Sequence, residues 1–266
     1  MNEQSAFNYV SYLQLDQILT AQTPMSVADD GFEHDEMLFI IIHQAYELWF
    51  KQLIHETGWL FQKLNENDLP NSLGTLRRIL TIMKTIVGQI DILETMTPLQ
   101  FNSFREFLAS ASGFQSVQFR ELEFMLGYKR ESMLKHFSPE VHGYEQLKQR
   151  YHERSLWDVF MHFLDRNGYP VSAELLNRDP SQPIQPSLEL QETLVRVYKN
   201  DAWIGRLCER LVDLDEGLQE WRYRHVKMVA RTIGSKMGTG GSTGVQYLES
   251  TVKPIWPDLW AVRAEL

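Results

Sequence analysis

The sequence predicts an all-α protein that forms a single domain from a few long helices. Apolar residues recur every three or four positions through most of the chain, which is the period of an amphipathic helix. No segment alternates apolar and polar residues between turn signals, as a half-exposed strand does. With 266 residues, of which 43% are hydrophobic, the chain is long enough to bury a sizeable core.

Three helices are predicted in the first half of the chain. Residues 35–64 offer Asp35 as an N-cap, and their run MLFIIIHQAYELWF is apolar nearly all round, so we expect burial on most faces. Residues 72–95 carry apolar side chains at helical spacing. Thr97, followed by a proline, is typical of the N-cap and first position of a third helix, 98–108.

The second half continues the helical pattern after a break at SASGF, residues 110–114. The proline-rich connection 179–187 is too short to indicate a domain boundary. Helices are expected at 115–127, 144–152, 155–166, 188–200 and 201–233.

The chain is expected to divide into an N-terminal arm, residues 1–21, and one all-α domain, residues 22–266. Tyr9, Tyr12 and Leu13 make the arm unusually apolar for a chain terminus. Docking of the arm on a partner subunit and docking on its own chain both explain this composition.

Composition excludes several classes of protein. The net charge of -9 leaves no excess of cations to hold the phosphates of nucleic acid. Cys208 is the only cysteine, so an intramolecular disulfide and a cysteine-based zinc cluster are excluded. The sequence begins without a signal-peptide pattern and has no apolar run long enough for a membrane span. We therefore expect a cytoplasmic protein.

Two histidines lie on apolar helix faces. His225 belongs to a stripe on the last long helix, and His43 has Phe39 and Tyr46 beside it on the most apolar helix. A buried imidazole without a partner costs about 1–3 kcal/mol, so each either hydrogen-bonds a neighbour or ligates a group. The pair has two possible interpretations: a haem pocket, and a non-haem metal site that includes Glu47. The stripe comprises Leu207, Leu211, Leu214, Leu218, Trp221, His225, Met228 and Thr232.

Arg105 lies on the apolar face that Phe101, Phe104 and Leu108 form on the third predicted helix. In one interpretation the apolar stem of the side chain carries its guanidinium to water. In the other the guanidinium lies in a hydrophobic pocket, where it binds the carboxylate of a ligand.

The stretch GSKMGTGGSTG, residues 234–244, is rich in glycine but follows a helix, and no lysine comes directly after any of its glycines. It therefore does not match a phosphate-binding P-loop. A substrate loop that closes over a small polar ligand and an ordinary surface loop are the two interpretations.

Four long blocks of sequence indicate a family. Together they resemble the tryptophan 2,3-dioxygenases, in particular the tetrameric bacterial form, and the likeness runs from about Tyr9 to Arg263. The blocks are HDEMLFIIIHQAYELWFKQLIHE (34–56), FREFLASASGFQS (104–116), WRYRHVKMVARTIG (221–234) and KMGTGGSTGVQYL (236–248).

The resemblance implies a homotetrameric enzyme with one haem b per subunit. Such an enzyme inserts both atoms of O2 across the indole C2–C3 bond of L-tryptophan and gives N-formyl-L-kynurenine, at the start of the kynurenine pathway. No nucleic-acid or membrane partner is implied.

The resemblance also assigns roles around the haem. His225 aligns with the proximal iron ligand and His43 with the distal histidine that hydrogen-bonds the indole N–H. Arg105 aligns with the residue that holds the substrate carboxylate. Phe39 aligns with a wall of the indole pocket, and Ser112 with a serine close to the haem.

Further expected substrate contacts come from the loop and the arm. Thr239 aligns with a hydroxyl that contacts the amino-acid end of the substrate. Tyr9, Tyr12 and Leu13 fall on an arm that, in the family, enters the site of the neighbouring subunit. Phe101 departs from the family, because some members carry a tyrosine there.

Overall fold

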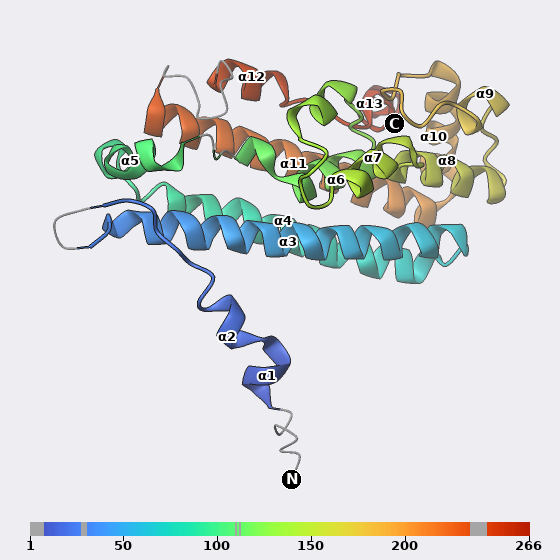
Figure 1. The fold of residues 1–266 in the computed structure, drawn as a ribbon. Coiled ribbons are helices and arrows are strands. Elements are labelled where there is room, and N and C mark those ends of the chain that lie inside the picture. Colours follow the sequence, from blue (N-terminus) through green and yellow to red (C-terminus); the bar gives the residue numbers. More distant parts are fainter. Residues whose placement is uncertain (1–7, 28–30, 110, 112, 235–243) are drawn as a thin grey trace, which may run out of the picture.

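A computed structural model of the chain describes residues 8–27, 31–109, 111, 113–234 and 244–266. These residues form helices and no β-strand, which confirms the all-α prediction (Figure 1). No helix among them is both long and apolar enough to cross a membrane. The elements are α1 (Tyr9–Leu13), α2 (Leu15–Ile18), α3 (His34–Asn65), α4 (Leu69–Leu93), α5 (Pro98–Phe104), η1 (Arg105–Leu108), η2 (Gly113–Gln115), α6 (Val117–Leu126), η3 (Glu131–His136), α7 (Tyr144–His152), α8 (Leu156–Arg166), α9 (Ala173–Leu176), α10 (Leu188–Asn200), α11 (Ala202–Ile233), α12 (Val245–Ser250), α13 (Pro257–Ala261) and η4 (Val262–Glu265).

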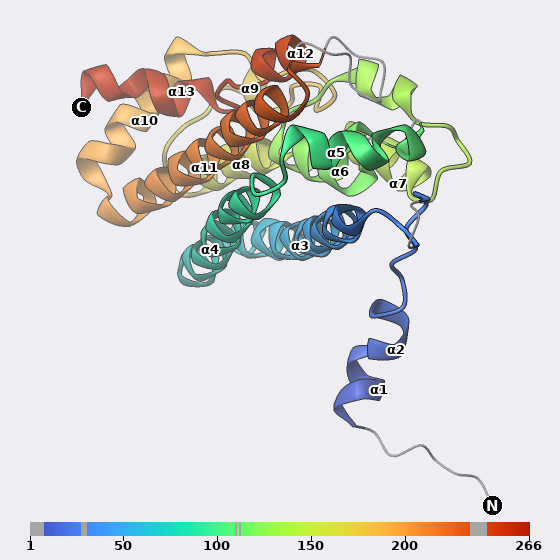
Figure 2. The ribbon, with the colours of Figure 1, turned by 90° about the vertical axis from the view of Figure 1, so that its left-hand side faces the viewer.

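Three long helices, α3, α4 and α11, form the frame of the body. Helix α4 packs along both α3 and α11, and α6 and α8 pack on α3. Figures 1 and 2 show α3 and α4 on one side of the body and α11 with the shorter helices on the other. The main core lies between them and is built of apolar side chains from all three helices, such as Leu60, Leu76 and Leu211, each with no exposed area. A second, smaller core lies around Phe124 and Leu147, between α6 and α7.

The helix boundaries differ from the predicted ones where capping decided them. Asp35 is not the N-cap of α3. Glu33 has the extended backbone of an N-cap, and Asp35 lies in the first turn. Helix α4 begins at Leu69, three residues earlier than predicted, because the Asp68 carboxylate caps it by accepting a hydrogen bond from the Asn71 amide.

The third predicted helix starts where expected but changes type. Thr97 caps α5 through a reciprocal pair of hydrogen bonds with Gln100, and this confirms the predicted start. The α-helix ends at Phe104, and the chain tightens into the 3₁₀ turn η1 from Arg105 onward. Because a 3₁₀ turn has three residues per turn, it changes the direction of the side chains that follow Phe104.

The arm extends away from the body in both views (Figures 1 and 2). Tyr9 is 73% exposed and Tyr12 is 67% exposed, so their rings do not pack on the core of their own chain. The arm joins the body near Gln22, whose side chain donates a hydrogen bond to Gln44 of α3. At its end the arm is also held by Gln44, which donates a hydrogen bond to the Ala21 carbonyl at 3.0 Å, whereas the side chains of α1 are not buried.

A buried carboxylate of α11 helps to fasten the C-terminal segment to the core. Asp215 of α11 accepts hydrogen bonds from the amides of Ile255 and Trp256, at 3.0 and 3.1 Å, and from the indole N–H of Trp260 at 3.0 Å. Trp256 has no exposed area and donates its own indole N–H to the Leu126 carbonyl at 3.0 Å. The last helix is therefore part of the core.

We predict that Asp215→Ala lowers the free energy of unfolding by about 3 kcal/mol or more, because three donors lose their acceptor in the interior. Urea denaturation followed by far-UV circular dichroism measures the change. Asp213→Ala is the matched control on the same helix, where the exposed pair with Arg210 contributes about 0–1 kcal/mol. Equal losses in the two variants would contradict the anchoring role of Asp215.

Candidate active site

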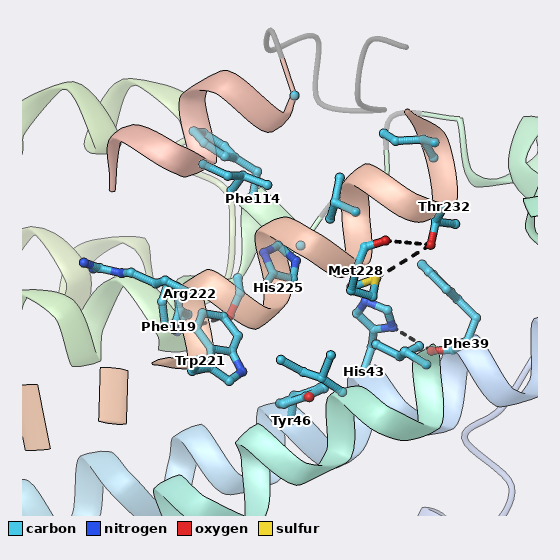
Figure 3. A pocket seen from close by; sticks show the side chains of 18 of the residues that line it. Phe39, His43, Tyr46, Phe114, Phe119, Trp221, Arg222, His225, Met228 and Thr232 are labelled. Carbon is cyan, nitrogen blue, oxygen red and sulfur yellow. Dashed lines mark hydrogen bonds between the residues drawn. The ribbon is translucent and has the colours of Figure 1, made fainter. Parts of the chain in front are cut away.

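A cavity of about 270 Å³ opens at one end of the bundle, between α3 and α4 on one side and α5, α6, α11 and α12 on the other. The stripe of apolar residues on α11 explains the position of the cavity. Leu207, Leu211, Leu214 and Leu218 are buried in the solid core. The same stripe continues as Trp221, His225, Met228 and Thr232, and these four residues line the cavity (Figure 3).

His225 lies on the cavity wall as a neutral imidazole. Burial lowers the pKa of His225 to about 4, and the nearby charges of His43 and Arg120 lower it in the same direction. Among the described residues, none forms a hydrogen bond or ion pair with the His225 ring. A neutral imidazole with a free lone pair is the form in which histidine binds a metal.

His43 lines the same cavity from α3 (Figure 3). Its Nδ1–H donates a hydrogen bond to the Phe39 carbonyl at 2.7 Å, because a carbonyl can only accept. Burial lowers the pKa of His43, against the opposing effects of the Phe39 carbonyl and the Glu47 carboxylate. The neutral ring is thereby fixed in the tautomer whose Nε2 can accept a hydrogen bond from a ligand.

Three phenylalanine rings form an apolar group beside His43. The Phe39 ring lies 4.1 Å from the His43 ring, and 5.9 and 5.6 Å from the rings of Phe101 and Phe104. Arg105, the residue that follows this group, is half-buried and also lines the cavity. The structure thus brings Phe39, His43, Arg105 and His225, which the sequence pointed to separately, around one space.

The inner end of the cavity carries a buried cluster of charges. Glu123 of α6 pairs with Arg120, with Arg222 at 2.6 Å and with Arg130 at 3.2 Å. Burial raises the pKa of Glu123, but the charges of Arg120, Arg222 and Arg130 bring it below its ordinary value. Three cations around one carboxylate leave this wall with an excess of positive charge.

Arg120 is the member of this cluster that is least satisfied by its neighbours. Its side chain is 8% exposed and lies over the rings of Phe114 and Phe119, at 5.2 and 5.0 Å. The Nε atom is buried and has no hydrogen-bond partner in the described part of the chain. Sequence reasoning missed Arg120 and Glu123, because an arginine and a glutamate three residues apart on a helix usually form an exposed pair.

Other predicted site residues do not lie in this cavity or are not described. Ser112 and Thr239 fall outside the described residues, as does most of the stretch 234–244. Its last residue, Gly244, is described and lines the cavity next to α12. Tyr9, Tyr12 and Leu13 belong to α1 on the extended arm (Figure 1) and do not line the cavity of their own chain.

The alternative of a non-haem metal site has little support from the geometry. Glu47 lines the cavity, but its carboxylate accepts a hydrogen bond from the Gln118 amide at 2.8 Å. No group of three or more His, Cys, Asp or Glu side chains that could hold a metal ion occurs among the residues that the structure describes.

Comparison with known proteins gives a consistent result over nearly the whole chain. The family model described as tryptophan 2,3-dioxygenase matches residues 1–169 and 189–266. The tryptophan 2,3-dioxygenase of Herpetosiphon aurantiacus is 58% identical, over 98% of this chain and 99% of the relative. That of Anaeromyxobacter dehalogenans is 51% identical, over 98% and 97%, and that of Bacillus thuringiensis 41%, over 97% and 92%.

These matches include the helices that carry His43, Arg105 and His225, and they extend over the arm as well as the body. Sequence blocks, fold and relatives therefore agree, and the chain belongs to the tryptophan 2,3-dioxygenase family.

Proposed function

We infer that this chain is a haem-dependent dioxygenase that inserts both atoms of O2 across the indole C2–C3 bond of L-tryptophan. The product is N-formyl-L-kynurenine, and the reaction opens tryptophan degradation by the kynurenine pathway. The observation that carries this inference is the pair of neutral histidines, His43 and His225, which line one cavity from two different helices. Family membership supplies the reaction.

The residues of the cavity fit haem b, one per subunit. Haem is a flat apolar ring with a central iron and two carboxylates, and the cavity offers matching groups. His225 presents an unpaired neutral imidazole for the iron, and aromatic side chains supply the apolar walls. Arg120 and the surplus positive charge around Glu123 suit the carboxylates. When bound, haem supplies the activation of O2.

The protein's own part of the reaction is to hold the substrate in one orientation. His43 accepts the indole N–H at Nε2, since its Nδ1 proton is held by the Phe39 carbonyl. The rings of Phe39, Phe101 and Phe104 exclude water from the indole. Arg105 binds the substrate carboxylate, and the two contacts together fix both ends of the amino acid.

Two further contacts and the assembly remain predictions. Thr239 is proposed to contact the amino-acid end of the substrate, and Ser112 to lie close to the haem. We propose that the arm, with Tyr9, Tyr12 and Leu13, docks in the site of a neighbouring subunit of a homotetramer. The exposure of Tyr9 and Tyr12 supports this, because water-exposed aromatic rings on an arm gain from burial on a partner. The cytoplasmic location also stays a prediction.

The proposed reaction is tested by mass spectrometry of the product formed from labelled O2. The haem-loaded, reduced protein is given L-tryptophan and ¹⁸O2, and N-formylkynurenine with two labelled atoms is expected. His225→Ala should form no product and lose most of its haem, because the cavity then lacks its unpaired imidazole. Haem uptake by the wild-type protein with no product would instead indicate a haem protein with a different role, such as a sensor.

Arg105→Leu should leave haem binding intact and raise KM for L-tryptophan at least about 30-fold, because a truncated charge-assisted pair costs about 2–5 kcal/mol. The variant should also lose the preference for L-tryptophan over tryptamine, which lacks the carboxylate. Steady-state kinetics with both compounds measure this.

Arg77→Leu is the control for this variant, because Arg77 is exposed and lies more than three helical turns before Ile90, the first residue of α4 that lines the cavity. An unchanged preference for L-tryptophan in Arg105→Leu would rule out the carboxylate contact.

Deletion of residues 1–15 should lower turnover more than haem content, because the site then lacks the arm of its neighbour. Co-expression with full-length His225→Ala subunits should restore activity, since each such subunit has an arm to donate but no functional site. Activity and haem content of the mixed oligomers measure the effect. Full turnover by the deleted protein alone would show that the arm is dispensable.

A further inference from the structure

We propose that Trp221 is a positioning residue for His225, and that its indole ring fixes the plane of the imidazole by parallel stacking. A histidine that binds a metal usually donates its second ring N–H to a carbonyl or carboxylate, which sets the orientation of the ring. No described residue accepts such a hydrogen bond from His225. The metal-binding role of His225 rests on the proposed function, whereas the stack is a feature of the chain itself.

The two rings lie one helical turn apart on the same face of α11. Their centroids are 5.4 Å apart and their planes differ by 4°, so the rings are parallel (Figure 3). The torsion that turns an imidazole about its bond to Cβ has a broad energy minimum. An unanchored His225 ring would therefore sample a wide range of planes, and the flat face of Trp221 limits that range.

Trp221 can fix another ring because it is itself held by three aromatic side chains. Phe119 of α6 lies 4.9 Å away, and Phe50 and Tyr46 of α3 lie 6.1 and 6.3 Å away. The Phe50 and Tyr46 rings meet the indole edge-on, at 86° and 68°. Contacts from two other helices therefore set the indole plane, and the indole transmits that plane to the imidazole on its own helix.

The indole N–H of Trp221 points into the core, toward the hydroxyl of Tyr46. The Nε1 atom is buried and has no hydrogen-bond partner in the described part of the chain. The Tyr46 hydroxyl faces the indole N–H and is placed to accept it, because a hydroxyl that donates its own proton, here to the Ile86 carbonyl at 2.9 Å, keeps its acceptor lone pairs. The flat face and the N–H of the indole are therefore separated by replacing Trp221 with phenylalanine, which keeps a flat face and has no N–H.

The stack is tested first in the haem-free protein with ¹³C- and ¹⁵N-labelled histidine. The ring signals of His225 are assigned by their loss in His225→Ala. In the wild type, the indole ring current should shift the imidazole C–H signals away from their free values. Trp221→Leu should abolish this shift, and Trp221→Phe should retain part of it, because a phenyl ring can still stack.

Haem titration and resonance Raman spectra of the loaded proteins test the consequence. Trp221→Leu should bind haem about tenfold more weakly, the size expected for one aromatic pair, and should broaden the iron–histidine stretching band. Trp221→Phe should keep most of the wild-type haem affinity and a band close to the wild-type width. Tyr46→Phe is the control for packing around the indole, and it should leave the His225 ring signals unchanged. Circular dichroism of each variant establishes that it is folded.

Two results would overturn the proposal. One is a folded Trp221→Leu variant with wild-type imidazole shifts and haem affinity. The other is a Trp221→Phe variant as impaired as Trp221→Leu, since the indole N–H and not the stacked face would then matter. If the wild-type protein bound no haem, the proposed function would fail, while the signals of the haem-free protein would still decide whether the stack orders His225.

Discussion

The buried carboxylate of Glu123 is the interaction on which the geometry of the site depends. It joins Arg120 of its own helix, Arg130 from the segment after that helix and Arg222 of α11. Arg222 also donates to the Thr251 carbonyl at 2.7 Å, directly after α12. One anion thereby holds three segments at fixed distances, and its removal would leave three cations facing each other in a poorly hydrated space.

The helix bearing His225 gains its position from this cluster and from the stripe on α11. Arg222 precedes His225 by three residues, so the ion pair to Glu123 fixes the rotation of α11 at the turn where the cavity begins. On the opposite side, the Phe39 carbonyl fixes the His43 ring. Each half of the site is therefore set by an interaction outside the space that a ligand would fill, which is how a binding site stays ordered before binding.

Much of this fold could be predicted from the sequence, because a regular apolar period along a long helix shows which of its faces is buried. The bounds of α7 and α10 were predicted, and the Thr97 cap was predicted from its neighbours. The short helices α9, α12 and α13 were missed, because four to six residues are too few to show a period. The cluster around Glu123 could not be predicted either. Arg222 belongs to a run of cations that is typical of a solvated helix face, and only the packing of the helices shows that its side chain is 4% exposed.

The burial of residues 255–262 in the core has a consequence for the order in which the protein folds. Trp256, Leu259 and Val262 are buried, and Asp215 has its hydrogen-bond donors only after residues 255–260 have been synthesised. Helix α11 therefore keeps an incompletely paired carboxylate and an uncovered apolar face until this segment, which begins 40 residues after Asp215, packs against it. A fragment that stops before residue 255 would leave this apolar face of α11 in water, and exposed apolar surface of this kind promotes aggregation.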